Sequence, residues 1–159
     1  MDPKNKPAQL NSPWVSKIMK YGGKAHVAVY RLTGGRIGSK WRIGAGFKKP
    51  VPTLLLEHVG RKSGKRFVTP LVYITDGPDI VVVASQGGRD DHPQWYRNLV
   101  ANPEAYVEIG RERRAVRAVT ADPEERARLW PKLVDAYADF DTYQSWANRE
   151  IPVVILQPR

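Results

Sequence analysis

The stretch that decides the fold is Pro52–Ser85, PTLLLEHVGRKSGKRFVTPLVYITDGPDIVVVAS. It holds three runs, 52–59, 67–75 and 79–85, which are rich in the β-branched and aromatic residues typical of strands. The joints between them, GRKSGKR and DGPD, contain glycine and are typical of turns. Because joints this short leave no room for a crossover helix, we expect the three strands to pair antiparallel.

Beyond residue 85 the sequence adds further strands with helices inserted between them. We expect strands at 105–109, 113–121 and 151–157, helices at 92–103 and 122–137, and then a short aromatic-rich turn or helix. Six mostly antiparallel strands with late helices predict an α+β fold, in which flanking helices cover a small closed or half-closed β-barrel.

The positive charge of this 159-residue chain is concentrated at its N-terminal end. Residues 1–49 hold eleven Lys and Arg and a single acid, Asp2, whereas residues 50–159 hold fifteen of each sign. We therefore expect a basic N-terminal arm and helix over 1–49 and a charge-balanced barrel domain over 50–159. A net charge of +10 points to anionic partners, which are nucleic acid, a membrane surface or a polyanionic small ligand.

Within the basic segment, residues 1–11 hold two prolines and no periodicity, so we expect them to be disordered. Ser12-Pro13 is typical of a helix start, because a capping hydroxyl precedes a proline. Apolar residues then recur at spacings of three and four as far as Leu32, which predicts an amphipathic helix that Gly22-Gly23 kinks or ends early. The glycine-rich stretch 33–50 is expected to be a loop.

Composition also excludes several kinds of site and compartment. The chain has no cysteine, which rules out disulfides, thiolate metal sites and cysteine nucleophiles, and its three histidines show no metal-ligand spacing. It contains neither a strand–GxGxxG–helix unit nor a Walker loop. No run approaches the roughly 18 apolar residues of a membrane span, and the polar N-terminus is no signal peptide, so we expect a cytoplasmic protein without a metal.

The turn GRKSGKR, Gly60–Arg66, gathers four cations and a serine around two glycines. Glycine permits turns that expose backbone N–H groups, arginine can grip phosphate or carboxylate through two hydrogen bonds, and lysine acts as a point charge. The turn is therefore either a polyanion site or a solvated hairpin tip.

Two further stretches have the composition of a ligand site. ASQGGRDDHPQWYRNL, Ala84–Leu99, joins a strand end to a helix through a glycine pair that would let a flat ligand approach the main chain. YADFDTYQSW places an aromatic residue at every third position from Tyr137 to Trp146. These rings form either a plug for the barrel mouth or a lid over an aromatic cofactor and its substrate.

Together the motifs resemble the deazaflavin-dependent nitroreductase family of actinobacteria. The shared pattern is Gly-Arg-Lys-Ser-Gly with Pro-Leu, then Ala-Ser-x-Gly-Gly, Pro-x-Trp-Tyr-x-Asn-Leu-x-Ala-Asn-Pro and a closing Tyr-x-x-Phe-x-x-Tyr-Gln-Ser-Trp. It covers the chain from about residue 50 to the C-terminus, and the N-terminal helix more weakly. The resemblance implies a split β-barrel and, as hydride donor, the reduced form of the deazaflavin coenzyme F-420.

That coenzyme has a flat aromatic head, a phosphodiester and a chain of glutamates, so the resemblance implies a long site. The basic turn would hold the phosphate and the tail through Arg61, Lys62, Ser63, Gly64, Lys65 and Arg66. The next strand would line the ring and its side chain through Phe67, Val68, Thr69 and Pro70. Two other segments would flank the ring system: Val83, Ala84, Ser85 and Gln86, and Gln94, Trp95, Tyr96 and Asn98. The implied hydrogen-bond donors to a carbonyl, quinone or nitro oxygen are Ser85, Tyr137 and Tyr143.

Two positions depart from the family pattern. Relatives commonly place arginine where this chain has Phe67, and Arg66 would point to the opposite face of the strand. Phe140 stands where the nitroimidazole-activating relative has tyrosine, so we expect quinones or conjugated enones to be better acceptors than nitro compounds. An FMN-binding reductase on the same type of barrel and a non-enzymatic basic binding protein remain as alternatives. Nucleic acid is not expected, because residues 50–159 have no net charge.

Residues 12–32 have the composition of a helix that lies at an anionic membrane surface. Their apolar residues include Trp14, Ile18, Met19 and Leu32, and their cations are Lys17, Lys20, Lys24 and Arg31. The sequence therefore leaves two alternatives, association with the inner face of the cell membrane and packing of this helix on the barrel.

Overall fold

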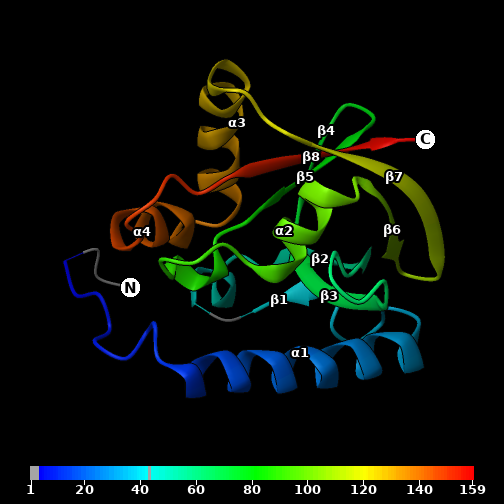
Figure 1. The fold of residues 1–159 in the computed structure, drawn as a ribbon, viewed down its shortest axis with the longest axis horizontal. Coiled ribbons are helices and arrows are strands. Elements are labelled where there is room, and N and C mark those ends of the chain that lie inside the picture. Colours follow the sequence, from blue (N-terminus) through cyan, green and yellow to red (C-terminus); the bar gives the residue numbers. More distant parts are fainter. Residues whose placement is uncertain (1–3, 43) are drawn as a thin grey trace.

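A computed structural model describes residues 4–42 and 44–159 of the chain. That part of the chain forms eight strands: β1 (Lys40–Trp41), β2 (Val51–Val59), β3 (Arg66–Val72), β4 (Ile74–Asp76), β5 (Asp79–Val83), β6 (Glu104–Ile109), β7 (Glu112–Thr120) and β8 (Val153–Pro158). It also forms helices α1 (Pro13–Thr33), α2 (Gln94–Ala101), α3 (Pro123–Ala136) and α4 (Asp139–Trp146), with 3-10 turns η1 (Gly44–Phe47) and η2 (Gln86–Gly88). Figure 1 shows α1 along the lower edge of the molecule, whereas α3 and α4 lie at the upper left.

All six expected strands are present, and the mixed α+β fold is confirmed. The expected run 67–75 is divided, because the chain changes partner at Tyr73: Val72 still pairs with β2, whereas Ile74 already pairs with β5. Strand β1 was missed in the sequence, since two residues pairing with Val51 and Pro52 carry no periodic signal.

The sheet curls around β2, which pairs with strands on both of its edges. Leu55 lies opposite Pro70 of β3 on one side and opposite Glu108 of β6 on the other. Every pairing among the described strands is antiparallel, in the order β1-β2-β6-β7-β8-β5-β4, with β3 attached to β2. Because β3 also lies against β5, the sheet closes into a split barrel.

The β5–β8 pair is buried on both faces, in a register that sets Ile80 opposite Leu156. Successive side chains of a strand point to opposite faces, so this pair serves two cores. One face joins the barrel core with the α2 residues Trp95 and Leu99, and it consists of Ile80, Val82, Val154 and Leu156. The other face packs against α3 and α4, and it consists of Val81, Val83, Val153 and Ile155.

Helix α1 runs without interruption through Gly22-Gly23, so the expected kink is wrong. The glycine pair lies where the helix approaches β3, and a Cβ on Gly23 would be 3.8 Å from Pro70 Cδ. Further along, Tyr30 is completely buried and its hydroxyl accepts a 2.7 Å hydrogen bond from the Gly110 backbone N–H. These contacts hold the helix straight against the barrel, although the Ser12 side chain makes no capping bond.

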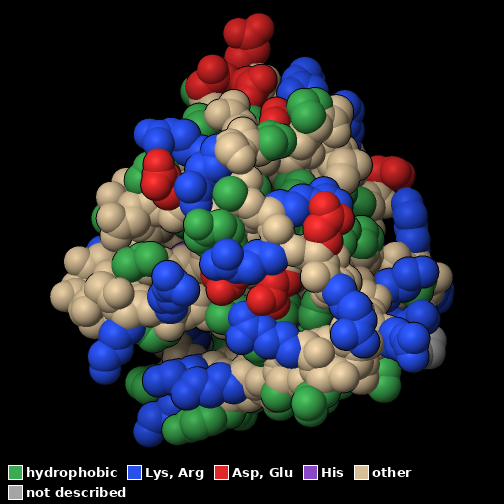
Figure 2. Space-filling model, turned by 90° about the vertical axis from the view of Figure 1, so that its right-hand side faces the viewer, with side chains coloured by type: hydrophobic (Ala, Val, Ile, Leu, Met, Phe, Trp, Pro, Cys, Tyr) green, Lys and Arg blue, Asp and Glu red, His purple; other side chains and the backbone are tan. Residues whose placement is uncertain are grey.

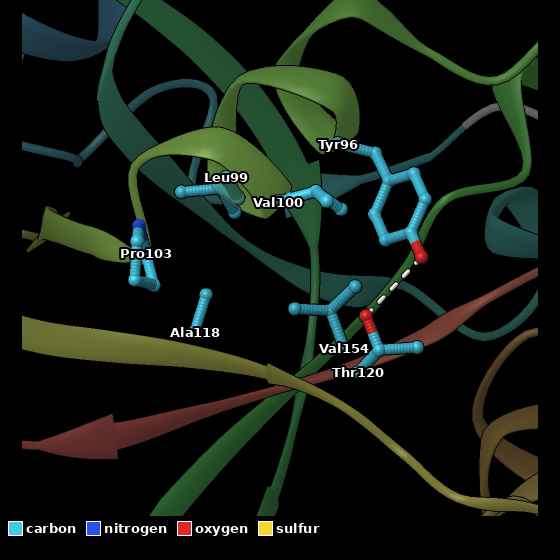
Figure 3. A pocket seen from close by; sticks show the side chains of 7 residues that line it. All are labelled: Tyr96, Leu99, Val100, Pro103, Ala118, Thr120 and Val154. Carbon is cyan, nitrogen blue, oxygen red and sulfur yellow. Dashed lines mark hydrogen bonds between the residues drawn. The ribbon is translucent and has the colours of Figure 1, made fainter.

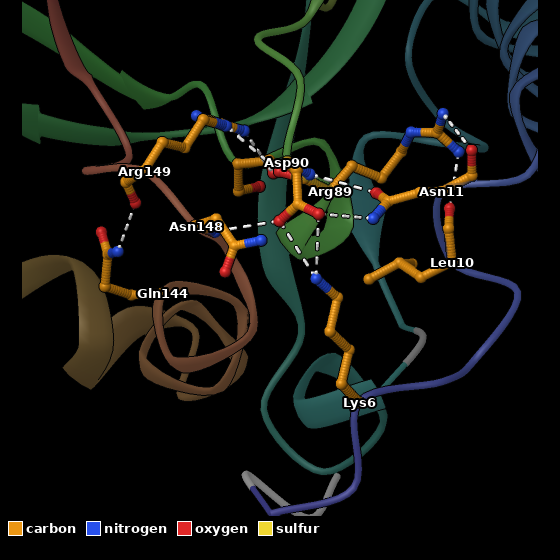
Figure 4. Close-up of polar contacts among 9 residues, drawn as sticks. Lys6, Leu10, Asn11, Arg89, Asp90, Gln144, Asn148 and Arg149 are labelled. Carbon is orange, nitrogen blue, oxygen red and sulfur yellow. Dashed lines mark hydrogen bonds and ion pairs between the residues drawn. The ribbon is translucent and has the colours of Figure 1, made fainter.

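The N-terminal arm is attached to the body of the protein from Lys6 onward. The Arg89 guanidinium, 4% exposed, donates to the backbone carbonyls of residues 10–12, at 2.6 Å for Leu10 (Figure 4). Asp90 accepts from Lys6 at 3.0 Å and from Asn11 at 2.6 Å. The expected disorder is therefore wrong for residues 6–11, because two side chains from a distant loop supply their partners. Residues 1–3, which belong to the same expectation, lie outside the described part of the chain.

The division of the chain at residue 49 remains a prediction about folding units, and several contacts cross it. Strand β1 pairs with β2 from the other side of that boundary, and Arg31 of α1 forms an ion pair with Glu108 at 2.9 Å. The basic segment is thus built onto the barrel along much of its length.

We expect Leu56→Ala to lower the free energy of unfolding by about 2–5 kcal/mol, because it leaves a cavity in the barrel core. Leu56 is completely buried between β3 and β6. The matched control is Leu32→Ala, which makes the same chemical change at a side chain that is 85% exposed. Urea unfolding of both variants measures the difference. A loss of similar size in both would contradict the packing of α1 described here.

Candidate functional site

The basic turn between β2 and β3 has a defined backbone. The Gly60 N–H donates to the Lys65 carbonyl at 2.8 Å, and the Gly64 N–H donates to the Gly60 carbonyl at 2.9 Å. Gly64 has a φ of 69°, the left-handed region that favours glycine. A Cβ on Gly60 would lie 2.7 Å from the Phe67 ring, so no larger residue fits there. The Ser63 hydroxyl accepts from the Lys65 N–H at 3.2 Å and tightens the turn further.

The four cations of this turn fall into two groups. Lys62, Lys65 and Arg66 are exposed, and their side chains form no ion pair or hydrogen bond with residues 4–42 or 44–159. Arg61 is committed to helix α2: its guanidinium donates to Gln94 Oε1 at 2.9 Å and to Asn98 Oδ1 at 3.0 Å. The turn therefore presents three free positive charges on a base that Arg61 fastens to the protein.

A chain of buried polar side chains continues from Arg61 to strand β3. The Asn98 side chain meets His58 Nδ1 at 3.1 Å, and His58 Nε2 meets Thr69 Oγ1 at 3.0 Å. His58 is 4% exposed, and burial lowers the pKa of its imidazole to about 4, so the ring is neutral at pH 7. Sequence reasoning missed His58. The available signal was a histidine at an inward position, which continues the alternation of Leu54 and Leu56 along β2.

Strand β3 sends its expected site residues to two different faces. Phe67 lies opposite His58 in the ladder and stacks on its ring, with centroids 5.8 Å apart. Thr69 lies opposite Leu56 and belongs to the same face, whereas Val68 and Pro70 belong to the other face, where Pro70 meets α1. Arg66 is likewise on the face opposite to Phe67, as the one-residue shift in the sequence predicts.

The segment after β5 has a strained backbone. Gln86, Gly87 and Gly88 have φ values of 46°, 64° and 84°, three successive residues in the left-handed region, and only the last two lack a side chain. A Cβ on Gly88 would lie 3.0 Å from the Tyr143 backbone, so this glycine permits close contact with α4. A Cβ on Gly87 would meet nothing within 4 Å, which leaves its backbone open to a ligand.

Arg149, just before β8, holds this strained segment in place. Its guanidinium donates to the carbonyls of Ala84 at 3.2 Å, Ser85 at 3.1 Å and Arg89 at 3.1 Å. Figure 4 shows the Arg149 side chain reaching the Arg89–Asp90 segment from the chain beyond α4. Sequence reasoning missed this clamp, because its acceptors are backbone carbonyls some 60 residues away.

Tyr137 and the aromatic residues of α4 pack together in one cluster. The hydroxyls of Tyr137 and Tyr143 lie 3.2 Å apart, and Trp41 Nε1 donates to the Tyr137 hydroxyl at 3.3 Å. Phe140 is 4% exposed and packs edge-on against both rings. Burial raises the pKa of both tyrosines, so their hydroxyls stay protonated. Ser85, the third expected donor, is 9% exposed and its hydroxyl has no hydrogen bond to the described residues.

The expected ligand residues of helix α2 point in three different directions. Gln94 and Asn98, one helical turn apart, both face the basic turn. Trp95 is 6% exposed and fills the barrel core together with Ala84. Tyr96 lies on a third side, where its hydroxyl meets Thr120 Oγ1 at 3.1 Å in a pocket of about 190 Å³ between α2 and β7 (Figure 3). The structure therefore joins Gln94 and Asn98, but neither aromatic residue, to the basic turn.

Comparison with known proteins identifies the family of the chain. Residues 23–158 match the family described as "F420H(2)-dependent quinone reductase". A protein of Mycobacterium tuberculosis whose name places it provisionally in this class is 65% identical over 118 residues, which are 74% of this chain and 99% of that protein. A second M. tuberculosis protein with the family name is 38% identical over 139 residues, covering 86% of this chain and 89% of that one.

Among solved structures, one named as an F420-H2 dependent reductase has a TM-score of 0.62 and 36% sequence identity, covering 67% of this chain and 94% of that chain. The resemblance to deazaflavin-dependent reductases, the split β-barrel and the reductase class are thereby confirmed. Coenzyme F-420 in its reduced form is the hydride donor of this family. The family match, the relatives and the solved structure together show that the chain belongs to the F420H(2)-dependent quinone reductases.

Proposed function

We propose that the chain reduces a quinone with a hydride from reduced coenzyme F-420, whose phosphate and glutamate tail bind at the basic turn. The observation that carries this proposal is the set of three exposed, unpaired cations on an ordered glycine turn that runs directly into β3. Three free cations gathered at one defined turn create a positive potential there, which favours a polyanionic ligand.

The residues present fit such a ligand. Lys62, Lys65 and Arg66 would bind the phosphate and carboxylates, since none of them has a competing partner in the described chain. Beyond them, Thr69 and the backbone at Gly87 would meet the aromatic head. Thr69 offers a hydroxyl group, and the space around Gly87 is open, so its backbone groups can be approached. Trp95 supports the site from within the barrel core. The FMN alternative is less well supported, because the family that matches uses the deazaflavin.

When bound, the coenzyme supplies a hydride, which brings the quinone two electrons and one proton; a second proton completes the hydroquinone. The chain orients the acceptor, excludes water and stabilises the charge that develops on its oxygen. Ser85 is the best placed donor for that oxygen, because its hydroxyl is not used by the described residues. Tyr143 is the second, whereas Tyr137 already accepts from Trp41 and supports Tyr143.

The finer choice of acceptor rests on the aromatic cluster of α4. Phe140 is buried between two tyrosine rings and offers no polar atom. We propose that flat carbonyl acceptors, quinones first and conjugated enones next, are reduced better than bicyclic nitro compounds, which would need a further donor at this position.

We expect Lys62→Glu to weaken binding of coenzyme F-420 at least tenfold at low salt and to reduce its salt dependence, because one cationic contact becomes repulsive. Quenching of tryptophan fluorescence during titration with the coenzyme measures the affinity. The matched control is Lys17→Glu on α1, which changes the net charge equally and is expected to leave the affinity unchanged. Equal affinities for wild type and Lys62→Glu would place the anionic tail elsewhere.

We expect Ser85→Ala to lower kcat/KM for a soluble quinone about thirtyfold, since one donor to a developing oxyanion contributes about 2 kcal/mol or more. Coenzyme affinity should remain as in wild type. Ser145→Ala serves as control, because that hydroxyl donates to the Thr142 carbonyl within α4. Unchanged turnover in Ser85→Ala would remove Ser85 from the reaction.

We also propose that α1 holds the protein at an anionic membrane surface. Tyr30 and Gly23 face the barrel, and the predicted apolar stripe lies on the opposite side of the helix. The stripe is exposed: Trp14 is 51%, Ile18 59%, Tyr21 64% and Leu32 85% accessible. Figure 2 shows Lys and Arg beside hydrophobic side chains along the lower edge of the molecule, where α1 lies.

The stripe and its cations suit binding in the plane of a membrane. In the described ranges, no helix has both the length and the apolar character needed to cross a bilayer. Each cation near an anionic surface contributes about 1 kcal/mol, and Lys17, Lys20 and Lys24 flank the stripe. A quinone dissolved in the membrane would then lie near the enzyme.

We expect Lys17→Glu to weaken sedimentation with phosphatidylserine-containing vesicles about thirtyfold, since the reversal replaces an attraction of about 1 kcal/mol with a repulsion of similar size. Here Lys62→Glu is the control for net charge and should bind as wild type. If both variants lose binding equally, attachment follows overall charge and α1 is not the contact.

A further inference from the structure

We infer that His58 is a positioning residue: it orders a one-way chain of hydrogen bonds from Arg61 to Thr69, which leaves the Thr69 hydroxyl proton free to donate to an oxygen of the bound coenzyme. This inference rests on the proposed binding of the coenzyme along β3. The chain has four members in sequence: Arg61, Asn98, His58 and Thr69.

The direction of the chain is fixed at Arg61. Both its backbone N–H and its guanidinium point at the same atom of Asn98, at 3.1 and 3.0 Å. Arginine carries only donors on its side chain, and a backbone N–H also can only donate. The atom that receives them must be the amide oxygen of Asn98. Its amide nitrogen is therefore the atom that faces His58.

The orientation of Asn98 decides the tautomer of His58. An amide nitrogen donates, so His58 Nδ1, 3.1 Å away, must accept and carries no proton. A neutral imidazole has one N–H, which then lies on Nε2. That N–H faces Thr69 Oγ1 at 3.0 Å and donates to it.

Thr69 is the end of the chain. Because its oxygen accepts the His58 proton, its own hydroxyl proton is directed away from His58. Thr69 is half-buried on the face of β3 that also carries Phe67. The free hydroxyl proton favours a ligand atom that accepts a hydrogen bond, as a carbonyl or ether oxygen does.

The surroundings of His58 maintain this direction of the hydrogen bonds, from donor to acceptor, along the chain. Phe67 covers the imidazole from the solvent side, and the ring is 4% exposed. Burial disfavours the imidazolium, whose second N–H would point at the Asn98 amide nitrogen, donor against donor. The side chain that starts the chain, Arg61, carries only donors. This arrangement also explains why Arg61 is turned inward while its three cationic neighbours in the turn remain free.

The first test is the tautomer itself, read by nitrogen-15 NMR of the imidazoles in the full-length protein at pH 7. A His58 signal of the neutral form with the proton on Nε2 is expected. A proton on Nδ1, or on both nitrogens, would overturn the inference. This measurement requires no variant and no coenzyme.

The second test compares Thr69→Val with Thr69→Ser in coenzyme titrations followed by tryptophan fluorescence. Removal of one neutral hydrogen bond should weaken binding up to about tenfold in Thr69→Val, whereas Thr69→Ser should stay within about threefold of wild type. Equal affinities for the three proteins would overturn the donor role of Thr69.

A double-mutant cycle tests the coupling between His58 and Thr69. His58→Leu should weaken coenzyme binding in the wild-type background and have little further effect in the Thr69→Val background, because the bond it orients is already gone. His58→Gln, which can keep a donor toward Thr69, should restore part of the affinity. Strictly additive losses would show that His58 acts only through the stability of the barrel.

Failure of this inference can be distinguished from failure of the proposed function. A protein whose affinity responds to Lys62→Glu but not to Thr69→Val binds the coenzyme without this donor, and only the inference fails. A protein that binds no coenzyme at all would refute the proposed function.

Discussion

The structure depends above all on the β5–β8 ladder, which is covered on both faces. Residues 80–83 and 153–156 are nearly all inaccessible, with one set of side chains in the barrel core and the other against α3 and α4. Burial on two sides fixes both the register and the direction of these strands, because a slip by one residue would exchange the two cores. The chain leaves β5 at Val83 and enters β8 at Val153, so the ladder also places Ala84 and Arg149 side by side. The strained segment with Ser85 and the glycine pair therefore begins directly at the end of a ladder that is buried on both faces.

A second feature is that the cations of the basic turn differ in their partners. Arg61 has a planar fork that can hold two side chains of α2 at once, and it is used for that purpose. The side chains of Lys62, Lys65 and Arg66 have no partner in the described chain. Residues 50–159 have no net charge, yet three cations remain unpaired at this turn, and some of the acids pair elsewhere. Glu57 and Glu108, for example, pair with arginines on the far side of β2 and β6.

The N-terminal segment connects the site with the surface of the molecule. Its arm is held by Arg89 and Asp90, immediately after the strained segment, and α1 touches β3 at Pro70. The same helix turns its apolar stripe outward. Helix α1 is thus packed against the barrel through one face and exposed on the other.

The sequence by itself determined every described strand except β1, although it joined β3 and β4 into one run. The helices of the C-terminal half and the position of the basic turn were likewise determined, because alternation, prolines and glycines are local signals. It also determined that four motifs occur in a family order. Only the tertiary structure decided which side chains meet. Gly22-Gly23 does not break α1, since packing on β3 and Tyr30 outweighs the low helix propensity of glycine. Trp95 and Tyr96 point away from the turn because α2 is anchored through Gln94 and Asn98. His58 and Arg149 gain their roles from partners up to some 65 residues distant, and no local pattern encodes such contacts.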